Sequence, residues 1–558
     1  MTRSTSADAA PGAGSTVSRR NILRLALAGA GVVASGPALA RTGLLGGTAG
    51  AVEQGTSVPG VVSDSSPITG PRVAKFAREL TIPAVLAPTT IVPAAQSETG
   101  RETHIYDLEH RVTTQQLLPA PFPKTEVWAY NGTVPGPTIK QTRNGPLTVV
   151  RNKNSLPAGH PYSMHLHGSP SQPIFDGHPD DLTAVGASKT YKFPNSQEGR
   201  TQWYHDHAMH QTAEHVYKGL AGFFIQEPAA ADVTKYGLDA LPKGKYDVPL
   251  MVQDMQFNAK GAATFDDKGH DSLWGNVNLV NGIAYPKMTV DKAKYRFRML
   301  VASVSRSFNF ALSNGAPLTI IGTDAALLPE PVQVSSYRHG MAERYEVVID
   351  FSRFATGTKI TLQNTAADAD MRDVMQFVVG AATGPALPLP LKLNDVVFPQ
   401  ERAVVQTRDF KFDRSNGQWS INGLTWNGSV AAAPKVGTTE KWILRTNSGG
   451  WFHPVHIHLV DFQILRRNGG PVLPYEKSWK DVAYVGANEE LEVLMTFHEP
   501  DVIDKTQPTL GKFVRHCHNL VHEDHDMMNQ FEIQPSATAK PAAMDEMPSM
   551  MVQWDLQA

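Results

Sequence analysis

Three of the Asn-Gly dipeptides in this 558-residue chain mark predicted turns at nearly regular intervals. Separated by 150 and 141 residues, they are Asn131-Gly132, Asn281-Gly282 and Asn422-Gly423. Asn-Gly is a strong signal for a two-residue hairpin turn, which needs a positive φ at both residues. After each turn comes a run in which apolar and polar residues alternate, at 147–151, 295–300 and 441–445. The pattern therefore predicts an all-β chain in which one strand-rich unit occurs three times.

The composition excludes several other classes of protein. Hydrophobic residues make up 41% and charged residues 19%, and the formal net charge is -2, so neither a disordered chain nor a nucleic-acid partner is expected. The 45 Gly and 40 Pro suit many short strands joined by tight turns. Cys517 is the single cysteine, which excludes an intramolecular disulfide and a zinc site built from several thiolates.

The amino-terminal end resembles a twin-arginine export signal. Arg19 and Arg20 precede an apolar stretch at 25–34 and a small-residue cleavage pattern ending at Ala40. The stretch is shorter than the roughly 20 apolar residues that span a bilayer, so no membrane span is expected. We predict cleavage after Ala40, with the twin-arginine machinery exporting the folded precursor to the periplasm, the cell envelope or the medium. A cytoplasmic protein with an intact amino terminus would contradict this.

The rest of the chain divides by composition and pattern. The predicted segments are a signal peptide at 1–40, a flexible segment at 41–73, three β-sandwich domains at 74–228, 245–382 and 396–536, and a Met-containing tail at 537–558. Linkers are predicted at 227–242 and in the Pro-rich run 384–390. The thioethers of the tail could collect Cu(I) or pack on the body, and packing is the favoured interpretation.

Four His-x-His pairs distinguish the first and third domains from the second. The pairs are His165 with His167, His205 with His207, His456 with His458, and His516 with His518. Residues i and i+2 of a strand point to the same face, so each pair presents two imidazoles on one side. Eight imidazoles can bind three copper ions with two, three and three ligands and leave positions open for oxygen. The second domain has Phe308-Asn309-Phe310 instead, and a role in spacing and interface is predicted for it.

Cys517 lies between two of these histidines and so predicts a second site. In an extended segment its thiol faces away from His516 and His518, so that one strand serves two sites. His453 precedes His456 by an odd offset and is expected on the side of the thiol. The covalent path from Cys517 to its two neighbours would join the two sites without a mobile carrier.

The residues around the thiol predict a blue-copper electron-transfer site. Two His, one Cys and a weakly bound axial Met are the ligands of such a site. The residues assigned to it are His453, Cys517, His522 and Met527. His525 and Met528 are the competing candidates.

These motifs, together with Trp203-Tyr-His-Asp-His and the stretch 130–138, resemble the multicopper oxidases, which consist of three cupredoxin domains with Greek-key topology. The segments around His453 and after His516 are most similar to bilirubin oxidases and, less closely, to spore-coat laccases. The resemblance covers about residues 74–536 and implies four coppers, one of type 1, one of type 2 and two of type 3. It implies type 2 ligation by His165 and His456. The type 3 ligands that it implies are His167, His205, His207, His458, His516 and His518.

The resemblance implies an oxidase that takes single electrons from an organic donor and reduces O2 to two waters. Bilirubin-like tetrapyrroles, phenols and aminophenols are the expected donors. Asp176 and Glu523 match positions that carry protons in similar oxidases, although either could instead orient a ligand histidine. Trp451, two residues before His453, resembles a tryptophan at the donor site of bilirubin oxidases, where it could pass electrons or only shield the copper. Asp206, between two ligands, is expected to be structural.

Three other functions fit the sequence less well than this one. A cuprous oxidase in copper tolerance is disfavoured because no Met-rich insertion directly precedes the third domain, where only Met371 and Met375 occur. A copper carrier or small electron-transfer cupredoxin needs only the blue-copper site, so the eight imidazoles outside that site would have no function in it. A non-catalytic, exported scaffold of the same fold should have lost ligands, whereas all twelve expected ligand positions are filled.

Overall fold

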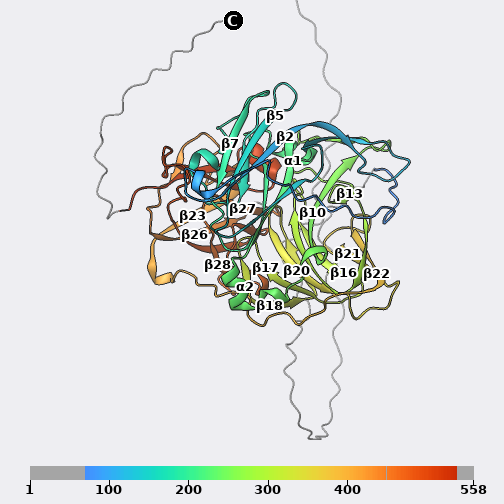
Figure 1. Cartoon of the computed structure of the whole chain (residues 1–558). Coiled ribbons are helices and arrows are strands. Elements are labelled where there is room, and N and C mark those ends of the chain that lie inside the picture. Colours follow the sequence, from blue (N-terminus) through green and yellow to red (C-terminus); the bar gives the residue numbers. More distant parts are fainter. Residues whose placement is uncertain (1–69, 448, 537–558) are drawn as a thin grey trace, which may run out of the picture. The chain divides into compact units, whose positions relative to one another are not determined.

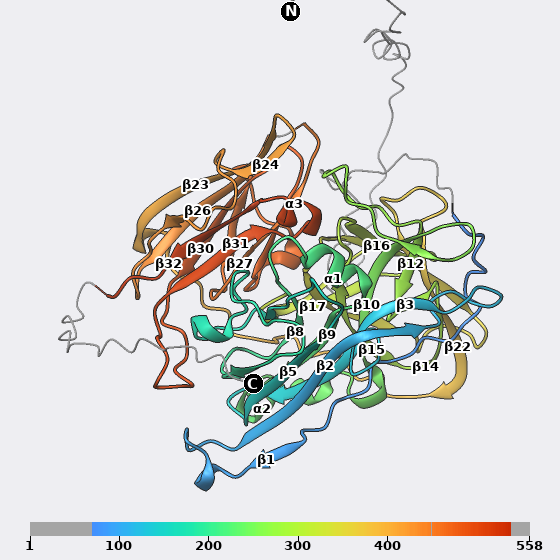
Figure 2. The same ribbon diagram turned by 90° about the horizontal axis from the view of Figure 1, so that it is seen from above.

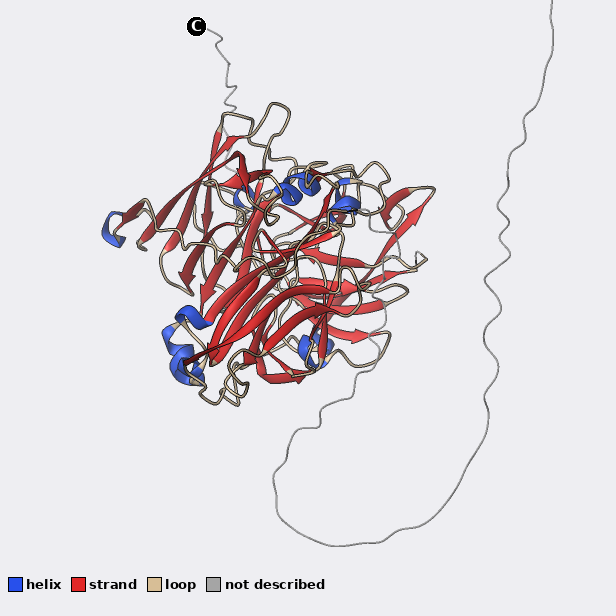
Figure 3. Cartoon of the chain, turned by 90° about the vertical axis from the view of Figure 1, so that its right-hand side faces the viewer, coloured by secondary structure: helices blue, strands red, loops and turns tan. Residues whose placement is uncertain are grey.

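The computed structural model describes residues 70–447 and 449–536. The predicted signal peptide at 1–40, nearly all of the segment 41–73 and the tail at 537–558 lie outside the described residues. Figure 3 shows strands throughout the described part, with a few short helices, which confirms the all-β prediction. Among the described helices, none is long and apolar enough to cross a membrane.

The first domain contains two sheets. One has the order β1-β2-β5-β7, with β3 paired to β2; its strands are β1 (Thr90–Val92), β2 (Thr103–Gln115), β3 (Thr125–Tyr130), β5 (Leu147–Ser155) and β7 (Ser188–Phe193). In the other sheet the strands follow the order β4 (Gly136–Thr142), β9 (Ala221–Glu227), β8 (Arg200–Asp206) and β6 (Met164–His167). In Figure 1, β2, β5 and β7 run side by side.

The second domain also contains two sheets. The larger has the order β13 (Ile283–Ala284), β12 (Val277–Val280), β10 (Asp247–Phe257), β15 (Lys294–Val301), β20 (Arg344–Asp350), β17 (Leu318–Gly322) and β18 (Leu327–Val334), with β11 (Ala263–Thr264) paired to β10. The smaller has the order β14 (Lys287–Lys292), β22 (Asp373–Thr383), β21 (Lys359–Asn364), β16 (Phe308–Leu312) and β19 (Ser336–His339). The two sheets enclose a core of aromatic and branched side chains.

The third domain repeats the arrangement, and its orange and red strands lie together in Figure 2. One sheet has the order β24 (Gln418–Ile421), β23 (Val404–Ser415), β26 (Thr439–Thr446), β30 (Glu490–Thr496) and β28 (Gln463–Arg467). The other has the order β25 (Val430–Ala432), β32 (Met528–Glu532), β31 (Lys512–Cys517), β27 (His453–Ile457) and β29 (Val482–Val485).

The helices are short and lie between strands. The α-helices are α1 (Thr212–Lys218), α2 (Ala230–Tyr236) and α3 (Leu520–Asp524). The 3-10 helices are η1 (Ala94–Gln96), η2 (Pro173–Phe175), η3 (Leu238–Ala240), η4 (Gly244–Tyr246), η5 (Glu401–Ala403) and η6 (Pro474–Glu476). The predicted linker at 227–242 therefore contains two helical turns, whereas no strand or helix occurs between β22 and η5.

The three Asn-Gly turns have one structure. Asn131, Asn281 and Asn422 have φ values of 49°, 48° and 55°, and each following Gly also has a positive φ, as the predicted turn type requires. Each Asn side chain accepts a hydrogen bond from a backbone N–H of a long neighbouring strand and donates one to the carbonyl two residues earlier in that strand. In all three domains this long strand pairs in parallel with the predicted alternating strand, in the pairs β2–β5, β10–β15 and β23–β26.

An apolar cluster joins the three domains. It includes Trp203 from the first domain, Met251 and Leu300 from the second, and Val482 and Leu520 from the third, all buried. Each large apolar side chain buried in this way contributes about 1.5–3 kcal/mol to stability. The cluster packs β8 of the first domain together with β29 and α3 of the third. Of these elements, β29 pairs with β27 and α3 follows β31, so the packing lies beside the strands that carry the His-x-His pairs.

Candidate metal centre

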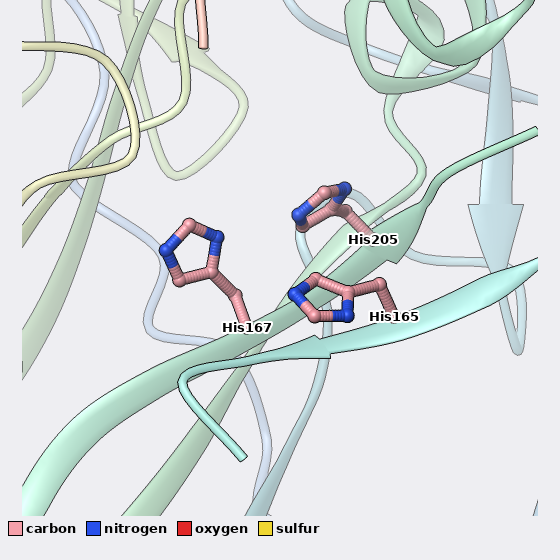
Figure 4. A group of neighbouring side chains, drawn as sticks. All are labelled: His165, His167 and His205. Atoms are coloured by element: carbon pink, nitrogen blue, oxygen red, sulfur yellow. The ribbon is translucent and has the colours of Figure 1, made fainter. Parts of the chain in front are cut away.

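The first-domain histidines project from the antiparallel strands β6 and β8. His165 lies opposite His205 in the pairing, and His167 lies opposite Trp203. Figure 4 shows the rings of His165, His167 and His205 close together on one side of the two strands. The fourth, His207, directly follows β8. Period-2 alternation therefore gathers these imidazoles on one face, as the sequence predicts.

The third-domain histidines meet them from the opposite side. His456 of β27 lies opposite His516 of β31, and His458 and His518 directly follow these strands. The Nε2 atoms of His165 and His456 are 3.4 Å apart, and those of His207 and His516 are 3.1 Å apart. The structure thus gathers all eight predicted imidazoles in one buried cluster between the two domains, with the His518 ring 5.2 Å from that of His167 between centroids.

In each of six rings, an acceptor lies beside the nitrogen that is turned away from the other imidazoles, which is called the outward nitrogen here. The Nδ1 atoms of His165, His205 and His456 donate to backbone carbonyls of Asp176, Asp206 and Asp481 at 2.6–2.7 Å. Carboxylates lie beside three more rings, with Asp176 Oδ2 at 2.8 Å from His458 Nδ1, Glu523 Oε2 at 2.8 Å from His516 Nδ1, and Asp481 Oδ1 at 3.1 Å from His167 Nε2. The hydrogen bonds to Asp176, Asp206 and Asp481 are of the kind that fixes the tautomer and orientation of metal-binding histidines.

The inward nitrogens fit a metal cluster. His167 Nδ1, His205 Nε2 and His518 Nε2 have no hydrogen-bond partner among the described residues, although all three are buried. Burial lowers the pKa of seven of the eight imidazoles; that of His205 falls to about 3, and the others lowered are His165, His167, His207, His456, His458 and His518. These seven are neutral at physiological pH and offer lone pairs, which is the state that binds metal.

A second group of donor atoms surrounds Cys517. Its Sγ lies 3.4 Å from His453 Nδ1 and 3.8 Å from His522 Nδ1, and these two nitrogens are 3.3 Å apart. The thiol faces the core of the third domain, whereas its neighbours His516 and His518 face the imidazole cluster. Burial raises the pKa of the thiol, so that a bound cation is needed to hold a thiolate here.

Met527 and the two competing residues have different surroundings. Met527 is buried in the same core as Cys517, and its carbonyl accepts a hydrogen bond from the Cys517 N–H at 3.2 Å. His525 instead stacks on His270 at 3.6 Å between ring centroids. Met528 belongs to β32 and lies opposite His516. The arrangement favours Met527 as the axial residue.

Three segments of the chain match the multicopper oxidase family, at residues 111–230, 201–366 and 398–537. A bilirubin oxidase of Albifimbria verrucaria is 39% identical over 508 residues, which cover 84% of this chain and 85% of that protein. The chain belongs to the multicopper oxidases. A laccase of Bacillus subtilis is 32% identical over 81% of this chain and 98% of its own length.

Solved structures of multicopper oxidases have the same fold. The enzyme of Pediococcus acidilactici superposes with a TM-score of 0.73 at 27% identity, over 84% of this chain and 94% of its own. The enzyme of Aquifex aeolicus gives 0.72 at 26% identity, over 83% and 100%. The predicted cupredoxin-like fold and the resemblance are therefore confirmed, and this multicopper oxidase is a copper-dependent oxidoreductase.

Asp481 and Arg344 belong to the centre of this multicopper oxidase but have no sequence motif. Arg344 Nη1 of the second domain donates to Asp481 Oδ1 at 2.7 Å, and its Nε donates to the Thr201 carbonyl of the first domain at 2.9 Å. Asp481 in turn holds His167 and His456. The sequence marks Asp481 only by its place after Lys480 and directly before the buried apolar strand β29. The second domain thus positions the cluster without supplying a ligand to it.

The predicted proton carriers flank the cluster on two sides. Asp176 is buried beside His165 and His458, and its Oδ1 has no hydrogen-bond partner among the described residues. Burial raises the pKa of Asp176 well above its usual value. Glu523, buried on α3, lies beside His516 and 3.5 Å from His207 Nδ1. The carboxylate of Asp206 points away and accepts a hydrogen bond from His215 at 2.6 Å.

Two tryptophans cover the Cys517 site. Trp451, which is partly exposed, meets the His522 ring edge-on at 5.6 Å between centroids. Trp419 of β24, which the sequence did not single out, stacks on the same ring at 3.6 Å and lies 5.2 Å from Trp451. Trp419 lies 32 residues before Trp451, and the sequence around it contains no motif that would connect the two. The two indoles therefore connect the surface with His522.

Proposed function

We propose that this multicopper oxidase takes single electrons from an aromatic organic donor at a type 1 copper and reduces O2 to two waters at a three-copper cluster. The observation that carries the proposal is the segment 512–518: the Cys517 thiol at the end of β31 faces one site, whereas His516 and the adjacent His518 face the other. Copper supplies one-electron redox chemistry at both sites when it is bound.

The proposed ligands follow the two groups of donor atoms. His453, Cys517, His522 and Met527 would hold the type 1 copper. His165 and His456, whose Nε2 atoms face each other at 3.4 Å, would hold the type 2 copper. The type 3 pair would be held by His167, His205, His207, His458, His516 and His518.

The protein performs three tasks around these ions. It would hold together the ions that collect electrons one at a time until the four that O2 requires are present. The backbone of Cys517 links the two sites covalently. It excludes water from the Cys517 site, since the thiol and both imidazoles are fully buried. It presents Trp451 and Trp419 toward the donor. Similarity to a bilirubin oxidase supports bilirubin-like tetrapyrroles as donors, and phenols and aminophenols are the other proposed classes.

Copper analysis with a visible spectrum tests the function. We expect about four copper ions per chain, a strong blue band and O2 uptake with a phenolic donor, because both groups of donor atoms are complete. A single copper without O2 uptake would indicate a carrier. A protein without copper would indicate a scaffold, and either result would contradict the proposal.

We expect Asp176→Asn to lower O2 turnover by about 100-fold, the scale of a lost proton-transfer group, and to retain the blue band. The amide oxygen can still accept the His458 hydrogen bond, so the orienting role survives and only the proton-carrying role is lost. Steady-state O2 consumption and the visible spectrum measure the two effects. Asp181→Asn, which removes a more exposed carboxylate paired with Lys189, is the matched control. Unchanged turnover in Asp176→Asn would remove the proton-carrying role.

A further inference from the structure

Arg515 is a fully buried cation on the strand that carries the Cys517 thiol. It lies two residues before Cys517 on β31, so both side chains point to the same face, into the core between the two sheets of the third domain. Arg is almost never fully buried unless it is paired with an anion. The charge at this position therefore requires an explanation.

The guanidinium of Arg515 has one hydrogen bond and no paired carboxylate among the described residues. Its Nε donates to Asn529 Oδ1 at 2.9 Å, whereas Nη1 and Nη2 have no hydrogen-bond partner in the described part of the chain. The group lies over Phe410 at 3.3 Å and over Trp442 at 4.7 Å from the ring centroids. Aromatic faces attract a cation but do not neutralise its charge.

The buried carboxylate that influences Arg515 already has a cation of its own. Arg408 donates to both oxygens of Glu440 at 2.7 and 2.8 Å, and Trp442 Nε1 also donates to Glu440. The Arg408–Glu440 pair is neutral as a whole, which leaves Arg515 as a net positive charge in the core. Burial and the charge of Arg408 lower the pKa of Arg515, but a guanidinium remains protonated at neutral pH because its ordinary pKa is so high.

This charge lies one layer of side chains from the Cys517 site. Two residues along a strand span about 6.6–6.8 Å. Strand β23 of the facing sheet shows the same offset, since its Phe410 contacts Arg515 and its Phe412, two residues on, lies 6.0 Å from the His453 ring. Arg515, Cys517 and His453 are all fully buried, so the interaction between the charge and the site is weakly screened.

We propose that Arg515 raises the reduction potential of the type 1 copper. This inference rests on the proposed function. When the site accepts one electron from the donor, its net charge falls by one, and a fixed cation stabilises the state of lower positive charge. No proton or ligand exchange is involved. An unpaired buried charge costs stability, so a purely structural role would be better served by an apolar side chain of similar volume.

The test is a redox titration of the blue band in the copper-loaded enzyme, comparing the parent with Arg515→Met. We expect the equilibrium between reduced and oxidised copper to shift about tenfold toward the oxidised state, which is a fall of ~59 mV for a one-electron couple. Arg445→Met is the matched control, because Arg445 is a half-exposed cation of the same domain paired with Asp409. Its removal is expected to shift the equilibrium less than about twofold, since solvent screens the charge.

A second variant keeps the Arg515 side chain and changes only the net charge. Asn529→Asp places a carboxylate at the existing 2.9 Å contact, and we expect a shift in the same direction as for Arg515→Met. If the potentials of both variants equal that of the parent within about twofold in the equilibrium constant, Arg515 does not tune the copper and the inference is overturned. A parent enzyme that lacks the blue band would refute the proposed function instead.

Discussion

Cys517→Ser is expected to abolish the blue band and to lower O2 consumption with an organic donor by at least about 1,000-fold, the scale on which loss of an essential group acts. The thiolate is the soft ligand that distinguishes this site, and a hydroxyl cannot replace it in binding copper. The same substitution leaves the eight imidazoles in place. We therefore expect the variant to lose about one copper ion per chain and to retain the other three.

Visible absorption, copper analysis and O2 uptake on the same preparation measure these effects. Met528→Leu is the matched control. Met528 is buried and directly follows Met527 in the sequence, but it belongs to β32, where its backbone pairs with that of His516. We expect it to keep the blue band. A Cys517→Ser protein that stays blue, or that consumes O2 at the parent's rate, would refute the assignment of both sites.

Arg344→Met is expected to destabilise the enzyme by about 3–5 kcal/mol, because it leaves the buried carboxylate of Asp481 without its cation. Arg344 and Asp481 are both fully buried, and their ion pair joins the second and third domains. Asp481 also holds His167, so we expect the affinity of the imidazole cluster for copper to fall by about 10–100-fold.

Denaturant unfolding and copper retention under a competing chelator measure the two effects of Arg344→Met. Arg353→Met is the matched control, since Arg353 is an exposed residue just beyond the same strand and pairs with Asp350. Removing that pair should change the free energy of unfolding by at most about 1 kcal/mol. Equal stability and equal copper retention in the two variants would show that Arg344 does not position the cluster.

The features that the sequence predicts correctly are local ones. An Asn-Gly turn is specified by two residues, and a His-x-His pair shares a face because strand alternation has a period of two. These rules sufficed for the three turns and for the opposite directions of Cys517 and His516. They need no knowledge of which domains touch.

The residues that sequence patterns do not reveal act through contacts with residues far away in the sequence. Arg344 meets Asp481 from 137 residues away, and neither lies in a repeated motif. Trp419 reaches His522 only because β24 folds over the Cys517 site. Arg515 would be expected on a surface by its residue type, and its burial follows from the rings of Phe410 and Trp442 that enclose it. Tertiary contacts decide each of these roles, and no local pattern encodes them.

The imidazole cluster draws half of its rings from residues 165–207 and half from residues 456–518. A nascent chain therefore completes its first domain on the ribosome long before the second half of the ligand set has been synthesised. Metal insertion at the proposed cluster would therefore be a late, post-translational event that follows docking of the first and last domains. A truncated product ending before β31 could fold locally in its earlier domains and still be unable to mature.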